Sequence, residues 1–447
     1  MNVRLLFPEG FLWGAATAAH QVEGHNFANN WWDWESQPGR IRDGSRSHPG
    51  TDQWIRYRED FALLHELGHT AHRLSLEWSR VMPAPGVLDQ QALAHYRAVL
   101  ECLRQYAIEP VVTLHHFTNP RWVEQQGSWR VDQREHFLRF VEEVVRSYRD
   151  LVRYWITINE PAVYANLGFV EGIHPPGDRS LRSGLRVLRN LLRAHQDAYA
   201  LIHALQPEAQ VSLAHNLAVL TPATHHPLDR LTAWLHDRLL NHAVLAACAA
   251  LHPPRLAVGM LRSPRQRRTL DFIGVNYYTR SLVRFAPHRP RSLFAAHTPG
   301  TEGPRSLFGW EVYPRGLFTL LCALRRYRLP VLITENGVAE EGDILRPWFL
   351  LAHLRAVHAA IRVGVDVRGY LHWTAFDNFE WAEGLRMRFG LVHVDFVTGA
   401  RTVKPSAWLY ARICRRNALE PRDWQEACRQ LAAGGASSAR GGGEQHV

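Results

Sequence analysis

One segment of the chain reads Val331-Leu332-Ile333-Thr334-Glu335-Asn336-Gly337. Its aliphatic and β-branched first half predicts a buried strand. Gly337 permits a sharp turn, so the chain can leave the sheet directly after Asn336. The segment therefore predicts a strand that ends in a carboxylic acid and an amide at one edge of a sheet.

Runs of the same kind recur along the chain, and each is followed by a helical stretch. We identify eight such runs: Phe11–Ala15, His69–Ser75, Pro110–His115, Tyr154–Asn159, Gln210–His215, Phe272–Asn276, Val331–Thr334 and Val367–Trp373. Amphipathic segments lie between them and predict helices, among them Asp89–Tyr106, Asp132–Tyr148, Gly184–Ala204 and Trp348–Val363. Strands that alternate with helices pair in parallel through right-handed crossovers. Eight units fit a closed (β/α)8 barrel, an α/β fold, better than an open sheet.

Length and composition agree with one large domain. The chain has 447 residues, of which 46% are hydrophobic and 21% charged, and this composition excludes long disorder for most of the chain. The length alone would also suit two or three domains, but no linker or composition break occurs before Ala432. We therefore expect a (β/α)8 domain over residues 1–431 and a flexible tail, rich in Gly, Ser and Ala, over 432–447.

Other features of the sequence indicate the cellular compartment in which the protein acts. No run of about 18 apolar residues exists, and the first residues contain no apolar stretch of secretory length, so we expect neither a membrane span nor a signal peptide. The five cysteines are odd in number and widely spaced, which argues against a disulfide framework or a CxxC metal site. These features predict a cytoplasmic protein without a membrane partner and leave a homo-oligomer open.

The net charge of +10 comes almost entirely from arginine. A basic cluster could attract nucleic acid or an acidic surface. Its members are Arg255, Arg262, Arg265, Arg267 and Arg268. This stretch contains proline and no interleaved aromatic residues, so a solvated loop is the favoured interpretation and no nucleic-acid partner is expected.

The barrel fold makes a demand on the sequence, because its catalytic groups lie at the C-terminal ends of the strands. Seven of the eight runs lead to polar or aromatic residues at that end: Gln21, Arg73, His115-His116, Asn159-Glu160, Asn276-Tyr277-Tyr278, Glu335-Asn336 and Trp373. Glu160 and Glu335 each leave a strand directly. Either Glu alone could equally be a strand-end carboxylate bonded to a loop. Two facing Glu residues with Asn, Tyr, Arg and Trp around them favour a catalytic site.

Several motifs in one order resemble glycoside hydrolase family 1, the retaining β-glucosidases and their relatives, along essentially the whole chain. They are residues 11–24, 73–80, 113–117, Thr157-Ile158-Asn159-Glu160-Pro161, Gly274-Val275-Asn276-Tyr277-Tyr278, Ile333-Thr334-Glu335-Asn336-Gly337 and Asp377-Asn378-Phe379-Glu380-Trp381. The resemblance implies hydrolysis of terminal non-reducing β-D-glycosyl residues by double displacement. It implies small β-glucosides or oligosaccharides as substrates, with β-galactosides and β-fucosides left open, and neither a cofactor nor a metal.

The resemblance also implies the catalytic roles. Glu160 is expected to be the acid/base and Glu335 the nucleophile, with their carboxyl groups roughly 5–5.5 Å apart as retention requires. Arg73 would keep Glu335 ionised, and Tyr278 could donate a hydrogen bond to it. The charge of Glu335 would then raise the pKa of Glu160.

Substrate-binding roles follow from the same resemblance. The expected hydrogen-bonding set is Gln21, His116, Asn159, Asn276, Glu380 and Trp381, with Trp373 as the stacking floor under the sugar. A carboxylate at Glu380 would accept from neutral hydroxyl groups and repel a phosphate, which disfavours a 6-phospho-β-glycosidase. Glu160, where a myrosinase-like thioglucosidase has Gln, argues against that branch.

Departures from the family pattern are mild. Phe117 replaces a common Trp, His72 a common Tyr and Thr374 a usual Ser, while Arg315 replaces a usual acidic residue. The segment between the fifth and sixth runs is also short for the family. The last two departures lie where they could alter the leaving-group side of the cleft.

Three alternatives compete with this interpretation. His65-Glu66-Leu67-Gly68-His69 matches the HExxH zinc-protease motif, which needs both His residues on one helical turn. Gly68 is expected to end the helix first, so a zinc site is disfavoured. A sugar-binding protein without turnover is disfavoured because both carboxylic acids are present. A scaffold whose 26 His residues bind metal or haem is the third alternative, and no spacing demands it.

Overall fold

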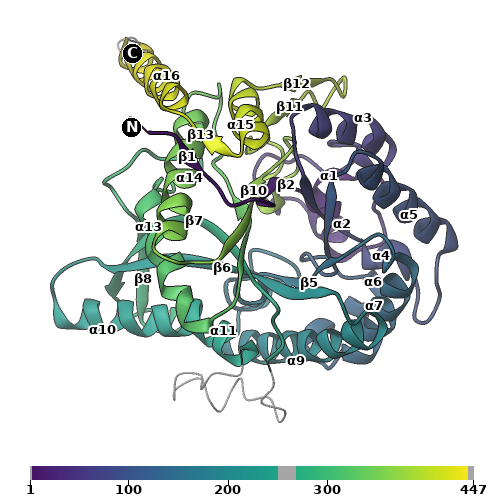
Figure 1. The fold of residues 1–447 in the computed structure, drawn as a ribbon. Coiled ribbons are helices and arrows are strands. Elements are labelled where there is room, and N and C mark those ends of the chain that lie inside the picture. The colour runs from purple at the N-terminus through teal and green to yellow at the C-terminus, as the bar shows by residue number, and fades with distance from the viewer. Residues whose placement is uncertain (1–2, 250–267, 441–447) are drawn as a thin grey trace.

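The computed structural model describes residues 3–249 and 268–440 and forms a closed barrel of parallel strands surrounded by helices (Figure 1). The barrel strands are β2 (Leu12–Ala16), β3 (Ala71–Ser75), β4 (Glu109–Thr113), β5 (Tyr154–Asn159), β6 (Gln210–Pro222), β7 (Ile273–Phe285), β9 (Val331–Asn336) and β10 (Val367–Trp373). They pair in the order β6-β5-β4-β3-β2-β10-β9-β7, and pairing of β6 with β7 closes the ring. The predicted (β/α)8 barrel is confirmed, and each predicted run overlaps one of its strands.

The register of the strands brings several polar strand ends to one level. Asn159 of β5 pairs with Ala214 of β6, Asn216 of β6 pairs with Asn276 of β7, and Asn276 pairs with Glu335 of β9. The pairing of β7 with β9 shifts register just before Asn276. Such an irregularity re-aims a side chain at the rim of a barrel.

Helices follow the strands along the chain. They are α1 (Ala19–Val22), α2 (Asn30–Glu35), α3 (Gln53–Glu66), α4 (Trp78–Val81), α5 (Gln90–Gln105), α6 (Arg121–Gln125), α7 (Arg134–Tyr148), α8 (Pro161–Asn166), α9 (Leu181–Leu205), α10 (Pro227–His236), α11 (Ala243–Cys248), α13 (Pro314–Leu324), α14 (Arg346–Arg362), α15 (Pro405–Arg416) and α16 (Pro421–Arg440). The long helices cover the outside of the barrel, whereas short ones such as α1 and α8 lie near its mouth. The four predicted helical segments are confirmed as α5, α7, α9 and α14. Asp89 caps α5 by accepting from the backbone N–H groups of Gln91 and Ala92, and Ser180 caps α9 by accepting from that of Ser183.

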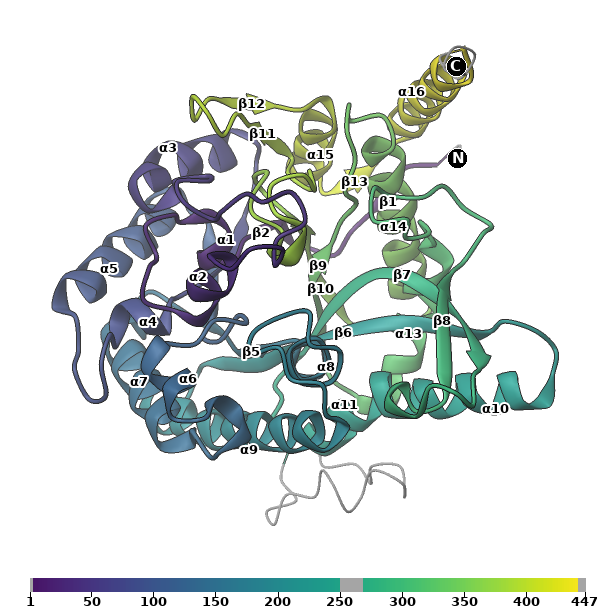
Figure 2. The ribbon, with the colours of Figure 1, turned by 180° about the vertical axis from the view of Figure 1, so that it is seen from behind.

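The remaining elements are short. They comprise strands β1 (Leu5–Leu6), β8 (Ala295–Pro299), β11 (Val392–Val394), β12 (Arg401–Val403) and β13 (Ala418–Leu419), the 3₁₀ helices Ser128–Arg130, Pro290–Ser292, Arg325–Tyr327 and Trp381–Glu383, and the π helices Leu167–Glu171 and Asp237–His242. Strand β1 pairs with β13, so the N-terminal segment lies beside the start of α16, and α16 then projects from the molecule (Figures 1 and 2).

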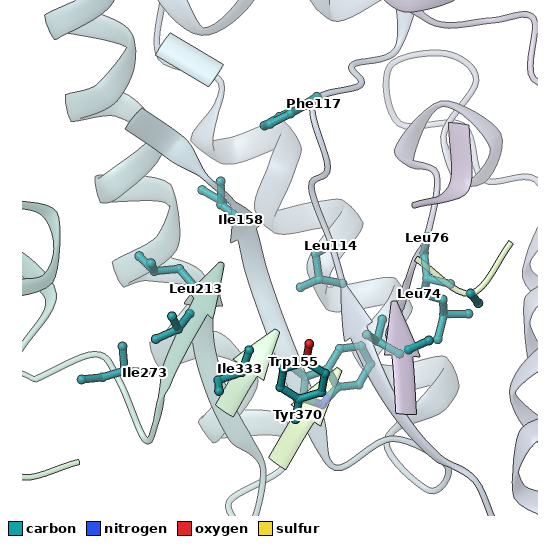
Figure 3. Packing of buried hydrophobic residues seen from close by; sticks show 14 of the residues in the cluster. Leu74, Leu76, Leu114, Phe117, Trp155, Ile158, Leu213, Ile273, Ile333 and Tyr370 are labelled. Atoms are coloured by element: carbon teal, nitrogen blue, oxygen red, sulfur yellow. The ribbon is translucent and has the colours of Figure 1, made fainter. Parts of the chain in front are cut away.

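The core has two parts because the side chains of a strand alternate between its two faces. On β5, Trp155 belongs to the large cluster between strands and helices, whereas Ile156 belongs to a smaller second cluster. On β9 the same alternation separates Ile333 from Leu332. Figure 3 shows members of the large cluster on several barrel strands, among them Trp155, Leu213 and Ile333. This packing on both faces holds the strand ends, and the site they carry, in fixed positions.

Strands β6 and β7 run well beyond the predicted segments and form an extension of the barrel. Strand β8 pairs with β7 in antiparallel fashion, and helix α10 packs on β6 and β7. Figures 1 and 2 both place α10 and β8 at the outer edge of the molecule. The sequence pattern did not predict this extension.

Two predicted segments differ from expectation or lie outside the description. The tail predicted from Ala432 is helical as far as Arg440, because α16 continues to that residue. Residues 441–447 lie outside the described residues, and so do Arg255, Arg262, Arg265 and Arg267 of the basic cluster. No helix among residues 3–249 and 268–440 is long and apolar enough to cross a membrane.

The HExxH segment does not form one helical turn. Helix α3 ends at Glu66, and Gly68 follows with a left-handed φ of +70°. His65 is exposed and lies 3.1 Å from the backbone oxygen of Tyr106 through Nδ1, whereas His69 is buried against Tyr410. The predicted end of the helix is therefore confirmed.

Candidate active site

The two predicted catalytic carboxyl groups leave neighbouring parts of the barrel rim. Glu335 belongs to β9, and Glu160 follows β5 directly and precedes α8. Glu160 has a left-handed backbone with φ of 45°, and its N–H donates to the backbone oxygen of Ala214 at 2.8 Å. A left-handed non-glycine residue costs free energy and is found preferentially at functional sites. Both side chains are buried, with residue exposures of 6% for Glu160 and 3% for Glu335.

The carboxylate of Glu335 is bonded to the guanidinium group of Arg73 and to the hydroxyl group of Tyr278. Arg73 Nη1 lies 2.5 Å from its Oε1, and the Tyr278 hydroxyl donates to its Oε2 at 2.5 Å. Arg73 is fully buried and is itself fixed, because its Nη2 donates to Asn159 Oδ1 at 2.7 Å and its Nε to Thr113 Oγ1 at 3.0 Å. Both carboxylate oxygens therefore accept from strong donors, which favours the ionised form.

Glu160 has only neutral partners. Its Oε1 accepts from Asn276 Nδ2 at 2.8 Å and from Asn216 Nδ2 at 3.0 Å. Asn276 Nδ2 also lies 3.1 Å from Asn159 Oδ1, and its own Oδ1 accepts from Thr334. A continuous chain of hydrogen bonds thus runs from Glu160 through Asn276, Asn159 and Arg73 to Glu335. The two carboxyl groups share one network and differ in the charge of their partners.

The pKa values follow from this difference. Burial and, to a smaller extent, the nearby charge of Glu335 raise the pKa of Glu160 to about 7, while the amides of Asn276 and Asn216 oppose that rise. Burial also raises the pKa of Glu335, but the charge of Arg73 and the hydrogen bond from Tyr278 oppose that rise. The expected rise in the pKa of Glu160 through the charge of Glu335 is confirmed in direction, and burial is the larger cause.

Both carboxyl groups open on one cavity of about 330 Å³. Eight predicted residues line it: His116, Asn159, Glu160, Tyr278, Glu335, Trp373, Glu380 and Trp381. Residues that were not predicted complete the lining: Phe117, Val163, Leu167, Ile173, His174, Asn216, Phe308, Trp310, Ala382, Glu383 and Phe389. The volume and the mixture of apolar walls with a few polar groups are typical of a small-molecule site.

Three predicted residues lie behind the cavity wall. Arg73 and Asn276 support the two carboxyl groups, as described above, and do not line the cavity. Gln21 is fully buried, and its Nε2 donates to the backbone oxygen of Phe379 at 2.9 Å and to Glu380 Oε2 at 3.2 Å. The Oε1 atom of Gln21 has no hydrogen-bond partner among the described residues.

Aromatic rings form one wall of the cavity. His116 stacks on Trp373 and on Trp381, with ring centroids 5.9 and 6.1 Å apart and interplanar angles of 19° and 20°. Asn159 Nδ2 lies 3.1 Å from His116 Nε2, and burial lowers the pKa of His116 well below its ordinary value. The imidazole is therefore neutral at neutral pH, and its flat surface is fixed.

Glu380 holds its proton more strongly than a free carboxyl group. Burial and, to a smaller extent, the charge of Glu335 raise its pKa to about 8, while the hydrogen bonds from Gln21 and Trp373 oppose that rise. A protonated acid can donate as well as accept a hydrogen bond. The expectation that Glu380 repels a phosphate by its charge stays a prediction.

Some strand-end residues point elsewhere. His115 lies 3.0 Å from Asn119 Oδ1 through Nε2, Tyr277 donates to the backbone oxygen of Tyr313 at 2.6 Å, and Asn336 donates to the backbone oxygen of Tyr277 at 2.7 Å. None of these three residues lines the cavity. Their side chains face away from the cavity and bond to neighbouring parts of the chain.

Asn216 is a functional candidate that the sequence pattern did not reveal. It follows the fifth predicted run, whose end at His215 offered no residue to the predicted site. The rule applied to the other seven runs would have found it one residue further along. Within the described residues, no group of three or more His, Cys, Asp or Glu side chains could hold a metal ion.

The geometry supports a specific pair of reactions at one cavity. Glu335 has the surroundings of a carboxylate that stays ionised, and Glu160 those of an acid that can lose and regain its proton near neutral pH. An ionised carboxylate can attack a carbon centre, and a neighbouring acid can protonate the group that leaves.

Comparisons with known proteins point to one protein family. The family model described as Glycosyl hydrolase family 1 matches residues 3–249 and 261–419. Beta-glucosidase A of Thermotoga maritima is 33% identical over 94% of this chain and 100% of its own length. The solved structure of a beta-glycosidase from Pyrococcus horikoshii has a TM-score of 0.87 and 36% identity and covers 95% of this chain and 98% of its own.

A third comparison concerns a bound ligand. The structure of the beta-glucosidase from Thermotoga maritima in complex with glucoimidazole has a TM-score of 0.87 and 30% identity. It covers 93% of this chain and 100% of that chain. The barrel, the carboxyl pair and these matches over nearly the whole length lead to one conclusion: the chain belongs to glycosyl hydrolase family 1.

Proposed function

We propose that this protein is a retaining β-glycosidase that removes terminal β-D-glucosyl residues from small β-glucosides or oligosaccharides. The observation that carries the proposal is the pair of buried carboxyl groups on one cavity, one held by Arg73 and Tyr278 and the other by two amides. Names of related proteins support the sugar: relatives include beta-glucosidases and, at 30% identity, a Beta-galactosidase of Sulfolobus acidocaldarius. Galactosides are therefore part of the proposal.

In the first step Glu335 attacks the anomeric carbon while Glu160 gives its proton to the glycosidic oxygen. The bond between that oxygen and the anomeric carbon breaks, the alcohol leaves, and a glycosyl ester forms on Glu335. Arg73 and Tyr278 keep the attacking carboxylate ionised and oriented until the bond forms. Burial and the charge of Glu335 raise the pKa of Glu160 to about 7, so a large fraction of this group carries the proton that it must give under neutral conditions.

In the second step the roles of the two groups change. The ester on Glu335 carries no negative charge, so one of the causes that raise the pKa of Glu160 disappears. Glu160, now ionised, takes a proton from water, and the water oxygen attacks the anomeric carbon. The ester bond breaks and Glu335 is released as a carboxylate. Two displacements leave the sugar with its original β configuration.

Sugar recognition is assigned to the aromatic wall and the deep polar end. Trp373 offers an apolar ring to the C–H face of a pyranose, and Asn159, held by Arg73 and His116, is placed to bond the 2-hydroxyl group. Protonated Glu380 and Gln21 behind it would bind hydroxyl groups further along the ring. Among the described residues that line the cavity there is no Arg or Lys, which favours a neutral sugar over a phosphorylated one.

The test is a panel of aryl β-glycosides with the product configuration read by NMR. We expect hydrolysis of the β-glucoside, with the β anomer of glucose as the first product. An α anomer as first product would contradict the retaining mechanism. Sugar binding without any turnover would instead support the sugar-binding alternative.

Location in the cell is part of the same proposal. All five cysteines are unpaired in the described structure, as expected in a reducing compartment. We infer that the enzyme acts in the cytoplasm on small glycosides.

A further inference from the structure

An apolar surface lies on the extension of the barrel, away from the described cavity. Helix α10 presents Leu228, Leu231 and Trp234 with exposures of 42%, 52% and 54%. These residues recur every third position, so they share one face of the helix. Leu293 and Phe294 before β8 are also exposed, and the Leu293 backbone oxygen lies 3.3 Å from Nε2 of His236, at the end of α10. We call these five residues the α10 face.

Contacts on the opposite side of α10 attach the helix to the barrel extension and leave the α10 face uncovered. Ala233 belongs to a small buried cluster with Val283 of β7 and Ala295 of β8. Asp229 is turned toward the same strands, because its Oδ1 accepts from the backbone N–H of Phe285 at 2.8 Å. The helix is therefore fixed by its inner side, and its apolar outer side is not needed for the fold.

Arginines that form no ion pair within the described residues surround the α10 face. They are Arg230 and Arg238 on or after α10, and Arg289 and Arg291 in the loop before β8. The ion pairs of this part of the described structure use other residues, Asp237 with His242 and Arg280 with Glu302 and Glu311. Arg238 lies over the Trp234 ring, 5.7 Å from its centroid. The rim of the apolar face is thus positive.

Charge decides between the possible occupants of the face. A second copy of this chain in a two-fold contact would place the same arginines opposite one another, which is unfavourable without carboxylates between them. An anionic lipid surface offers apolar chains to Leu and Trp and phosphate groups to Arg at the same depth. Leu and Trp on one face of a helix with Arg around them is the pattern of a helix that lies in a membrane interface.

We propose that the α10 face binds the surface of an anionic lipid bilayer, with α10 parallel to it. The attachment is peripheral and reversible, because the face is small and no described helix spans a membrane. It departs from the expectation that the chain has no membrane partner, which rested on spanning segments alone. The proposal does not depend on the proposed glycosidase function.

The test is flotation of the purified full-length protein with vesicles. Vesicles of phosphatidylcholine mixed with phosphatidylglycerol are compared with vesicles of phosphatidylcholine alone, at low and at high salt. We expect flotation with the mixed vesicles only and release by salt, since salt screens exposed charges. Equal flotation with both vesicles, or none with either, would overturn the proposal.

Variants locate the binding surface. Leu231→Ser combined with Trp234→Ser should lower vesicle partitioning by about tenfold or more. Trp408→Ser, at a residue of α15 that is 38% exposed, is the matched control and should float like the wild type. Circular dichroism checks that both variants fold. Equal flotation of the double variant and the wild type would show that another surface binds.

Removal of charge gives a second, smaller effect. Arg230→Ser and Arg238→Ser should each lower partitioning by about fivefold. Arg139→Ser, at an exposed residue on the outer face of α7, is the control and should have no effect. Light scattering excludes the other occupants: a dimer that the Leu231→Ser, Trp234→Ser variant loses would assign the face to a second copy. Binding to soluble polyglutamate without vesicle flotation would assign it to an acidic protein.

Discussion

The end of β9 and the end of β5 each carry a buried glutamate, and the two differ in what surrounds it. At β9, Arg73 and Tyr278 donate to Glu335. At β5, the neutral amides of Asn216 and Asn276 donate to Glu160. Burial acts on both carboxyl groups, so burial alone cannot separate their roles. The charge of the partners separates them, and on this difference we base the proposal that Glu335 attacks and Glu160 transfers the proton.

Removal of the carboxylate at the β9 end should have the largest effect. Glu335→Ala leaves no nucleophile, so hydrolysis of an aryl β-glucoside should fall by on the order of 10⁴-fold or more. Added azide should restore turnover and give the α-glycosyl azide, because azide can attack once in the space left by the carboxylate. The measurement is aryl release together with NMR of the product.

The matched control for this variant is Glu341→Ala, at an exposed residue soon after the same strand. It should hydrolyse the substrate at the wild-type rate. Unchanged turnover in Glu335→Ala, or a β-glycosyl azide as its product, would contradict the role assigned to the β9 end.

Removal of the acid at the β5 end should have an effect that depends on the leaving group. General acid catalysis contributes about 10²- to 10⁴-fold, and a good leaving group needs little of it. Glu160→Ala should therefore lose far more kcat/KM for cellobiose than for a dinitrophenyl β-glucoside. Glu171→Ala, at an exposed residue beyond α8, is the control. Equal losses for both substrates would remove the distinction between the two ends.

Tyr278→Phe weakens the β9 end without removing its carboxylate. The variant loses one hydrogen bond to a charged group, so kcat/KM should fall by about 10- to 100-fold. The acid limb of the pH profile should move to higher pH, because the hydroxyl group opposes the rise in the pKa of Glu335 caused by burial. Tyr106→Phe, at a half-buried residue directly after α5, is the control and should leave the profile unchanged. An unshifted acid limb in Tyr278→Phe would show that Tyr278 does not tune Glu335.

The pH dependence of the β5 end should show the smallest effect. The first step needs protonated Glu160, so kcat/KM of the wild type should fall as the pH rises through about 7. The Asn216 amide lowers that pKa, so Asn216→Ala should move the alkaline limb to higher pH with only a modest loss of rate. Glu380→Gln separates the titration of Glu380, whose pKa burial raises to about 8. A shift to lower pH in Asn216→Ala would contradict the assignment.

Much of the fold and the site could be predicted because the place of each strand in the barrel restricts which residues can stand in the strand and directly after it. Runs such as Val331–Thr334 are apolar since both faces of a barrel strand are buried, and the residue after each run must lie at the rim. This rule identifies Glu160, Glu335, Arg73 and Trp373 from the order of residues alone.

The rest depends on three-dimensional packing that no local pattern records. Asn216 is the exception: the strand-end rule could have found it, but the predicted run stopped at His215 whereas β6 continues to Pro222. The raised pKa of Glu380 follows from its burial in the folded chain, and exposure of Leu231 and Trp234 follows from what α10 packs on. The segment after Ala432 was expected to be a flexible tail because it is rich in Gly and Ser. It is helical as far as Arg440, since Gly and Ser lower helix propensity without forbidding a helix.

The most direct test of which strand end carries the nucleophile is to trap the glycosyl-enzyme intermediate. A 2-deoxy-2-fluoro-β-glucoside with a dinitrophenyl leaving group should react once and remain on the nucleophile, because the fluorine slows the second step. Mass spectrometry of the digested protein should then find one fluoroglucosyl group on Glu335. A label on Glu160, or steady turnover without any label while the product is the α anomer, would contradict the account.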